Sequence, residues 1–353
     1  MNITGWKFLD LAVTLVLGLC GALLAKAGGL PIPYLLGSLG SVAAVSLTRY
    51  ARTGARFWFP QPLRRAAVAT IGTMIGATFT AEILSTAPSL LMSLSAIILF
   101  VALAQSANYV IFRHIGRYDV TTSIFSAMPG GLIEAVTLGE KAGANIEKLS
   151  VQHFVRIVLV IVSVPTLFWL FTGRTVGSAA GQTLELSPAH WNDWLWIAII
   201  APIGVFVGPR LKLPASHMLG PMLLAAVLHA SGVITVQGPT LLLNAAQLVV
   251  GSALGTMFAR STLRHLAAAM GLGGLSVATM LSLATGIAYV LDGHVPMSFE
   301  ALVISFAPGG VTEMSLVALS LGISPVLVTV HHIFRIIFTV SVAGVMASRA
   351  TRG

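Results

Sequence analysis

The sequence predicts an all-α polytopic membrane protein made of two inverted repeats. Of its 353 residues, 56% are hydrophobic and only 9% are charged, whereas a soluble domain has roughly a quarter of its residues charged. Apolar runs of about 18 residues or more, the length that crosses a bilayer as a helix, recur along the chain. A third observation, a stretch that occurs twice, predicts the repeats.

The repeated stretch covers residues 126–156 and 305–335. It reads SAMPGGLIEAVTLGEKAGANIEKLSVQHFVR in the first copy and SFAPGGVTEMSLVALSLGISPVLVTVHHIFR in the second, at an offset of 179. Each copy holds a Pro-Gly-Gly sequence, a glutamate just after it and a His-x-x-Arg sequence in the next apolar run. The candidate substrate-binding residues are Pro129, Gly130, Gly131, Glu134, His153 and Arg156, with the counterparts Pro308, Gly309, Gly310, Glu313, His332 and Arg335.

Six apolar stretches are expected in each half. They cover about 8–25, 33–48, 64–82, 89–112, 121–139 and 149–172, and then 193–209, 215–233, 241–259, 267–291, 301–321 and 325–347. Further matches extend the duplication, among them the spaced glycines of Gly72-x-x-x-Gly76 and Gly251-x-x-x-Gly255, which favour close helix packing. The predicted division is a first membrane repeat over 1–172, a polar linker over 173–190 and a second membrane repeat over 191–353.

Basic loops predict how the halves are oriented, because Lys and Arg collect in cytoplasmic loops. In the first half they follow the second and fourth stretches, whereas in the second half they follow the first and third. The second-half loops 232–239 and 292–296, equivalent to the basic loops of the first half, contain no Lys or Arg. The halves are therefore expected to face opposite ways, with both termini cytoplasmic.

Opposite orientation requires an odd number of crossings in each half, so one of the six stretches should not cross fully. We expect about five crossing helices and one broken or re-entrant Pro-Gly-Gly segment in each half. Proline lacks the N–H that continues a helix, and glycine lets the backbone turn sharply. The run 33–48, which is entered through Pro31-Ile-Pro33, is the alternative re-entrant segment.

The glutamates and arginines of the repeated stretch place charges near or within apolar runs. An unpaired charge at the centre of a membrane helix costs about 3 kcal/mol on insertion scales. An ion pair is therefore expected within each half, joining Glu134 to Arg156 and Glu313 to Arg335. Such a pair could be purely structural and lock the break to the helix. In the functional interpretation, the glutamates are proton or substrate sites and the arginines anchor an anion.

His153 and His332 lie one helical turn before those arginines, on the same helix face. Each is either a proton relay near neutral pH or a hydrogen-bonded core imidazole. The other histidines and the single cysteine, Cys20, show no metal-ligand spacing. Asp10 and Asp193 fit helix-start caps better than binding groups. We therefore expect no metal, no other cofactor and no catalytic residue, and we do not expect an enzyme.

The blocks MPGGLIEAV…H-x-x-R and APGGVTEM…H-x-x-R resemble those of the bacterial membrane AbrB family, in which one membrane module is duplicated. The resemblance covers essentially the whole chain. Members of the family are labelled regulators of gene expression or ammonia monooxygenases. The family is in turn similar to antiporters and anion symporters that are built from inverted repeats with crossed broken helices.

Inverted repeats with interrupted helices favour a secondary transporter, here one of the inner membrane that exports a small solute, anionic in one interpretation, or exchanges it for protons. The alternative is a membrane-bound regulator of gene expression that acts through a partner or a metabolite. An ammonia monooxygenase-like enzyme is favoured less, because no persuasive set of copper ligands is present. The expected partners are the lipid bilayer, a small-molecule solute and protons, with no direct nucleic acid; a homodimer is compatible with this view.

Overall fold

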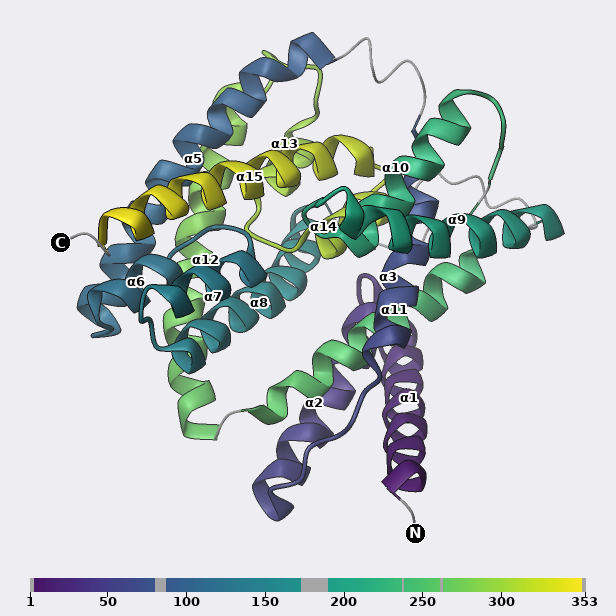
Figure 1. Cartoon of the computed structure of the whole chain (residues 1–353), viewed down its shortest axis with the longest axis horizontal. Helices are drawn as coiled ribbons and strands as arrows, with labels where there is room; N and C mark the ends of the chain where they lie inside the picture. The colour runs from purple at the N-terminus through teal and green to yellow at the C-terminus, as the bar shows by residue number, and fades with distance from the viewer. Residues whose placement is uncertain (1–2, 80–86, 173–189, 237, 261–262, 351–353) are drawn as a thin grey trace. The chain divides into compact units, whose positions relative to one another are not determined.

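The computed structural model of the chain describes residues 3–79, 87–172, 190–236, 238–260 and 263–350 (Figure 1). All regular elements in these ranges are helices, which confirms the all-α class. The predicted linker over 173–190 lies outside the described residues except for residue 190.

The α-helices of the second half follow the same order as those of the first across the described residues. The first half contains α1 (Ile3–Ala27), α2 (Pro33–Thr53), α3 (Gln61–Gly76), η1 (Ala87–Leu90), α5 (Leu91–Val110), η2 (Ile111–Ile115), α6 (Val120–Ser126), α7 (Leu132–Lys141) and α8 (Ile146–Thr172). The second half contains α9 (Trp191–Arg210), α10 (Ser216–Ala230), α11 (Thr240–Thr256), η3 (Met257–Arg260), α12 (Leu263–Leu291), α13 (Phe299–Phe306), α14 (Val311–Ser320) and α15 (Pro325–Ala350).

Six helices in the described ranges are long and apolar enough to cross a membrane. These spans are Trp6–Ala27, Leu91–Ile115, Ile146–Phe171, Trp191–Arg210, Ala267–Leu291 and Pro325–Ala343. They form three matched pairs between the halves, α1 with α9, α5 with α12, and α8 with α15. The chain is therefore a polytopic α-helical membrane protein.

Both Pro-Gly-Gly sequences interrupt a helix, as predicted. The first separates α6 from α7 and the second separates α13 from α14; none of these four helices exceeds 10 residues. Ten helical residues extend about 15 Å, half of the 30 Å hydrocarbon core of a bilayer. The alternative segment is unbroken, because α2 continues for 21 residues from Pro33 to Thr53. The breaks therefore lie at the Pro-Gly-Gly sequences.

The first break is a helical hairpin. The backbone N–H of Asn145, which follows α7, donates to Thr122 Oγ1 in the first turn of α6 at 2.8 Å. Close packing accompanies this bond, since a Cβ added to Gly139 of α7 would lie 3.4 Å from the Cβ of Phe125 in α6. The start of α6 and the end of α7 therefore lie together, and the chain turns back at residues 127–131.

Contacts divide the chain into two compact units, and each unit draws on both halves. Unit 1 is Met1–Ala81, Pro165–Leu263 and Leu316–Val326; unit 2 is Glu82–Val164, Arg264–Ser315 and Leu327–Gly353. Unit 2 contains both Pro-Gly-Gly breaks and both His-x-x-Arg sequences. The sequence repeats and the compact units are thus two different divisions of the same chain.

Unit 1 is held together by glycines that the duplication repeats. A Cβ on Gly72 of α3 would collide with the carbonyl oxygen of Met218 in α10, and one on Gly251 of α11 would collide with that of Leu35 in α2. Leu35 and Met218 are themselves counterparts, at an offset of 183. The glycine-containing helix of each half, α3 or α11, therefore packs against a helix of the other half, and the spaced glycines allow close packing as predicted.

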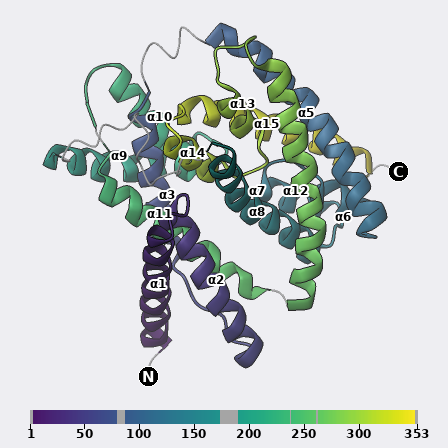
Figure 2. The ribbon, with the colours of Figure 1, turned by 180° about the vertical axis from the view of Figure 1, so that it is seen from behind.

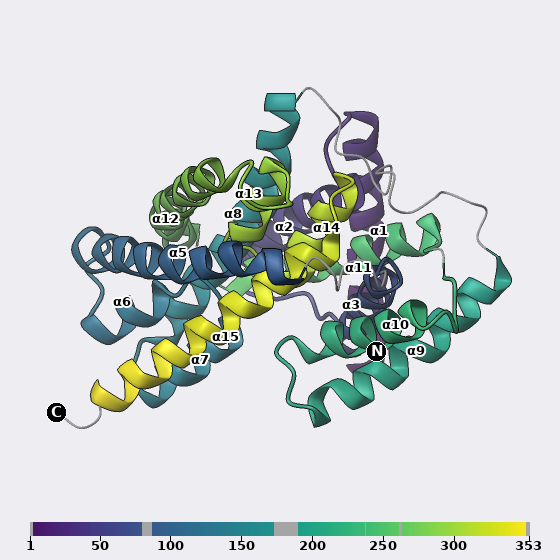
Figure 3. The same ribbon diagram turned by 90° about the horizontal axis from the view of Figure 1, so that it is seen from above.

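A second matched pair of contacts joins neighbouring helices inside each half. In α1 and α2, which lie side by side (Figure 2), Gly21 and Gly37 face each other with no room for a Cβ. In α9 and α10, also side by side (Figure 3), Gly204 and Gly220 do the same. The same packing is thus built twice within unit 1.

Candidate functional site

The twelve residues that the sequence predicts as a site all lie in unit 2. The Pro-Gly-Gly sequences form the two helix breaks, the glutamates lie in the helices that follow them, and the His-x-x-Arg sequences lie in α8 and α15. Both arginines are buried, with 5% of Arg156 and 1% of Arg335 exposed. Their guanidinium groups must therefore find hydrogen-bond acceptors inside the protein.

Backbone carbonyls at the breaks accept these hydrogen bonds. Arg156 Nη1 donates to the carbonyl oxygen of Met128, just after α6 ends. At the counterpart position, Arg335 Nη1 donates to the carbonyl oxygens of Ala307 and Phe306, and its Nη2 donates to that of Gly309 at 3.0 Å. Met128 and Ala307 are separated by the same 179 residues as the two arginines. The duplication therefore preserves the contact as well as the residues.

These contacts correct the expected ion pair between Glu134 and Arg156. In the part of the chain that the structure describes, the two side chains form no salt bridge, whereas Arg49 and Asp10 do, at 2.7 Å. The bonds from Arg335 likewise go to backbone oxygens. The last carbonyls of a helix have no partners within it, and at the breaks they accept hydrogen bonds from the buried arginines.

The glutamates occupy the opposite side of each break. Gly131 and Gly310 precede α7 and α14, so Glu134 and Glu313 stand at the third helical position, where a glutamate can fold back over the helix start. A Cβ added to Gly131 would lie 3.1 Å from Glu134 Oε2, and one added to Gly310 would collide with Glu313 Oε2. Both carboxylates therefore lie against the amide ends of the second half-helices.

Each break is consequently compensated at both ends. A cationic arginine meets the carbonyl end of the preceding helix, where the macrodipole is negative, and an anionic glutamate meets the amide end of the next, where it is positive. Both repeats supply the same charges, one arginine and one glutamate for each break. These charges are placed at helix ends, and at the first break the carbonyl end of α6 takes the role that the sequence assigns to Glu134 as the partner of Arg156.

Arg335 also connects the two breaks. A Cβ added to Gly130 of the first break would lie 3.5 Å from Arg335 Nε, while the Nη atoms of the same side chain bind carbonyls of the second break. The two repeats thus bring their breaks together within unit 2.

The two histidines are hydrogen-bonded inside the protein. His153 Nε2 lies 2.9 Å from the carbonyl oxygen of Phe125 in α6, and His332 Nδ1 lies 2.9 Å from that of Val328 in its own helix. Because a carbonyl can only accept, these ring nitrogens carry the hydrogen. This geometry matches the interpretation of both residues as hydrogen-bonded core imidazoles. The two rings differ in that His153 donates through Nε2 to another helix, whereas His332 donates through Nδ1 to its own helix.

Two serines also belong to the site, although the sequence prediction does not include them. Ser126 and Ser305 are counterparts, 4% and 0% exposed, and their hydroxyl groups have no hydrogen-bond partner within the described residues. The same holds for the Nε atoms of Arg156 and Arg335. The sequence contains one indication of their role, because a serine begins both copies of the repeated stretch. Such buried donors usually bind water or a ligand.

Comparison with known proteins shows the family of the chain. A family model described as "Transition state regulatory protein AbrB" matches residues 39–351. The chain belongs to the AbrB family. This AbrB-family protein is 26% identical over 291 residues to "Putative regulator AbrB" of Escherichia coli (strain K12), covering 82% of this chain and 81% of the relative. It is also 26% identical over 259 residues to "Uncharacterized protein YhjN" of Bacillus subtilis (strain 168), covering 69% and 67%.

Proposed function

We propose that this AbrB-family protein is a proton-coupled secondary transporter of the inner membrane that carries a small anion. The observation that supports it is the pair of charge-compensated helix breaks within one compact unit, connected through Arg335. Interrupted membrane helices near a repeat interface present free backbone groups to a solute. The basic loops support an orientation with both termini in the cytoplasm.

The chemistry of the breaks favours an anion. The start of a helix offers unpaired N–H groups and a positive dipole to a negative group. Beside the first break, buried Arg335 has an Nε with no hydrogen-bond partner among the described residues, and a guanidinium binds carboxylate strongly. A small carboxylate is the solute class that these donors fit best.

The glutamates supply the coupling to protons. Glu134 and Glu313 already hold their carboxylates against the starts of α7 and α14, the place that a solute carboxylate would take. An arriving anion displaces the glutamate, and two negative charges close together in a buried site repel each other unless one carboxyl is protonated. The glutamate then binds a proton, so that anion and proton are carried together. Exchange would instead move anion and proton in opposite directions.

Flux measurements in proteoliposomes test this proposal. The purified full chain would be reconstituted with an internal pH-sensitive dye and supplied with a panel of radiolabelled small carboxylates. We expect uptake of one panel member with protons moving in the same direction. The double variant Glu134→Gln, Glu313→Gln should lose the proton movement while remaining folded. Glu140→Gln, an exposed position in the same helix α7, is the matched control and should behave as the native protein.

Two results would overturn the proposal. The first is proton-coupled uptake that persists in the double glutamate variant, and the second is the absence of uptake for every carboxylate tested. If protons move in the direction opposite to the anion, the protein is still a transporter, but it exchanges the anion for protons and does not carry the two together.

The second candidate is a membrane-bound regulator of gene expression. Its support is the name of the Escherichia coli relative, "Putative regulator AbrB". A stable protein partner that copurifies from cross-linked membranes, together with no solute flux, would favour this function. We assign no catalytic residue and propose no enzymatic activity for either candidate.

A further inference from the structure

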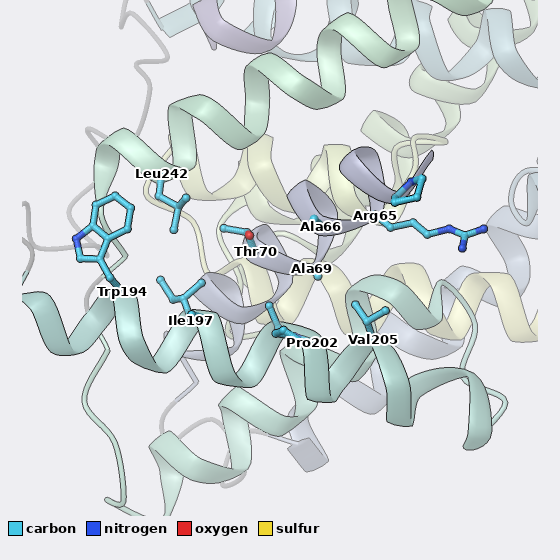
Figure 4. A pocket seen from close by; sticks show the side chains of 12 residues that line it. Arg65, Ala66, Ala69, Thr70, Trp194, Ile197, Pro202, Val205 and Leu242 are labelled. Carbon is cyan, nitrogen blue, oxygen red and sulfur yellow. The ribbon is translucent and has the colours of Figure 1, made fainter. Parts of the chain in front are cut away.

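Unit 1 carries an apolar groove that the proposed transport mechanism does not use. Its volume is about 560 Å³, and it runs between α3 and α9, with Leu242 of α11 at one end (Figure 4). Alanine, isoleucine, proline and valine side chains form most of its lining, and Thr70 is a polar exception. The volume falls within the range of sites that bind small organic ligands.

The groove has an aromatic end and a charged end. Trp194 and Leu242 lie at one end, and Arg65 lies near Val205 at the other (Figure 4). From Trp194 to Val205, α9 advances 11 residues, which is about 16 Å. This length is close to half of the hydrocarbon core of a bilayer, about 15 Å. A groove of this length on a membrane-spanning helix matches the acyl chain of one leaflet.

Positive charge collects at the Arg65 end. Arg65 is exposed, and within the described residues it forms no salt bridge. The helix α9 ends beyond Val205, at the same end of the groove, with Arg210, and Lys212 follows it. The acidic residue of α9, Asp193, lies at the opposite end of that helix. An anionic headgroup is the complement of this arrangement.

We propose that the groove binds one acyl chain of an anionic phospholipid, with the headgroup phosphate held by Arg65. A zwitterionic lipid such as phosphatidylcholine would fill the apolar floor equally well, but its choline would bring a positive charge to an end of the groove that is already basic. A second copy of this chain would have to bring an acidic group to the same place. The site is independent of the proposed function, because none of its residues belongs to unit 2.

Tryptophan quenching by brominated lipids tests the site directly. The full chain would be reconstituted in vesicles of phosphatidylcholine that contain a small fraction of either brominated phosphatidylglycerol or brominated phosphatidylcholine. Subtracting the signal of Trp194→Phe isolates the Trp194 contribution from the other tryptophans. We expect brominated phosphatidylglycerol to quench Trp194 at about fivefold lower mole fraction, the preference that one basic residue near an anionic surface provides.

Neighbouring arginines provide the matched control. Arg65→Gln should abolish the preference for phosphatidylglycerol, whereas Arg64→Gln, whose residue does not line the groove, should retain it. Ala198→Phe, which fills the groove, should remove the quenching by both lipids. Equal quenching by the two lipids that Arg65→Gln leaves unchanged would overturn the proposal.

The lipid proposal would also be overturned if a second copy of this chain occupied the groove. In a Cys20→Ser background, Ala198→Cys would then form a disulfide between two copies in vesicles, with no quenching of Trp194 by either lipid. A monomeric band together with selective quenching supports the lipid site.

Discussion

Arg335 in the second half of the chain lies against Gly130 in the first half, at a point where a Cβ on the glycine would come within 3.5 Å of Arg335 Nε. The same guanidinium holds three carbonyl oxygens of its own break. One side chain thus fixes the carbonyl end of one interrupted helix and borders the other. This arrangement makes the breaks a single buried structure instead of two separate loops.

Gly130 and Gly131 should respond differently to alanine. At Gly130 the added methyl group would be in ordinary van der Waals contact at 3.5 Å, so Gly130→Ala should leave stability nearly unchanged. Gly131 has φ of 66°, a left-handed conformation that costs a residue with a Cβ about 1–2 kcal/mol. Thermal unfolding of both variants in detergent would measure the difference. A Gly131→Ala variant as stable as Gly130→Ala would contradict the described turn.

Arg335 should contribute more to stability than Arg156. Arg335→Met removes hydrogen bonds to three carbonyls, whereas Arg156→Met removes the bond to Met128. Leaving a buried acceptor without a donor costs about 1–3 kcal/mol, so Arg335→Met should lower the free energy of unfolding by at least that amount more. Chemical denaturation in a mild detergent would compare the two variants. Equal losses would show that the additional bonds of Arg335 do not stabilise the break.

The matched glycines of unit 1 should be equally intolerant of a side chain. Gly72→Ala and Gly251→Ala each place a methyl group against a backbone carbonyl of the facing helix, which should destabilise the protein by about 2 kcal/mol. At Gly40 in α2, an added Cβ would have no atom within 4 Å, and Gly40→Ala is the control. Melting temperatures of the three variants test this expectation. A Gly251→Ala protein that melts like the control would contradict the close packing of α11 on α2.

The start of α6 should carry a pH-dependent contribution to stability. Burial raises the pKa of Asp119, but the hydrogen bonds from Thr122 and the charge of Lys148 outweigh it, and the pKa lies below its usual value. A lowered pKa means that the cap stabilises the fold above the unfolded pKa of about 4 and that this stability is lost as the pH falls through the folded pKa. Thermal unfolding between about pH 3 and pH 7 would show the loss.

The second half supplies a natural control for this effect. Ser298, the counterpart of Asp119, caps α13 with an uncharged hydroxyl that accepts from the N–H of Ala301. Asp119→Ser should therefore keep the cap at neutral pH and reduce the loss of stability in acid. An unchanged pH profile in Asp119→Ser would show that other groups cause the acid sensitivity.

Much of the fold follows from patterns that act within a few residues. A proline followed by two glycines removes a helix N–H and lets the backbone turn sharply, so the breaks were predictable at Pro129 and Pro308. A proline alone does not have this effect here, since Pro165 lies inside α8 and Pro202 inside α9. Spaced glycines mark close packing for the same local reason. The cap predicted at Asp193 is likewise present, since its carboxylate accepts the N–H of His190 at 3.0 Å.

The partners of the charged residues were not predictable in the same way. The sequence predicts a helix cap at Asp10 as well, but this residue pairs with Arg49 in α2 and accepts the N–H of Trp58 in the segment after α2. Arg156, for which the sequence predicts a carboxylate partner, binds a carbonyl oxygen. A sequence shows which side chains carry charge, but backbone oxygens are the same at every position, and only the folded chain decides which of them lie within reach.

The exchange of glycine contacts between α3 and α10, and between α2 and α11, has a consequence for how the molecule is made. Neither half of the chain can complete unit 1 alone, because each supplies the surface that the other requires. The contacts between the two halves within unit 1 therefore resemble those between the two protomers of a dimer. Two separately expressed fragments, divided between α8 and α9, should accumulate in the membrane only when they are made together.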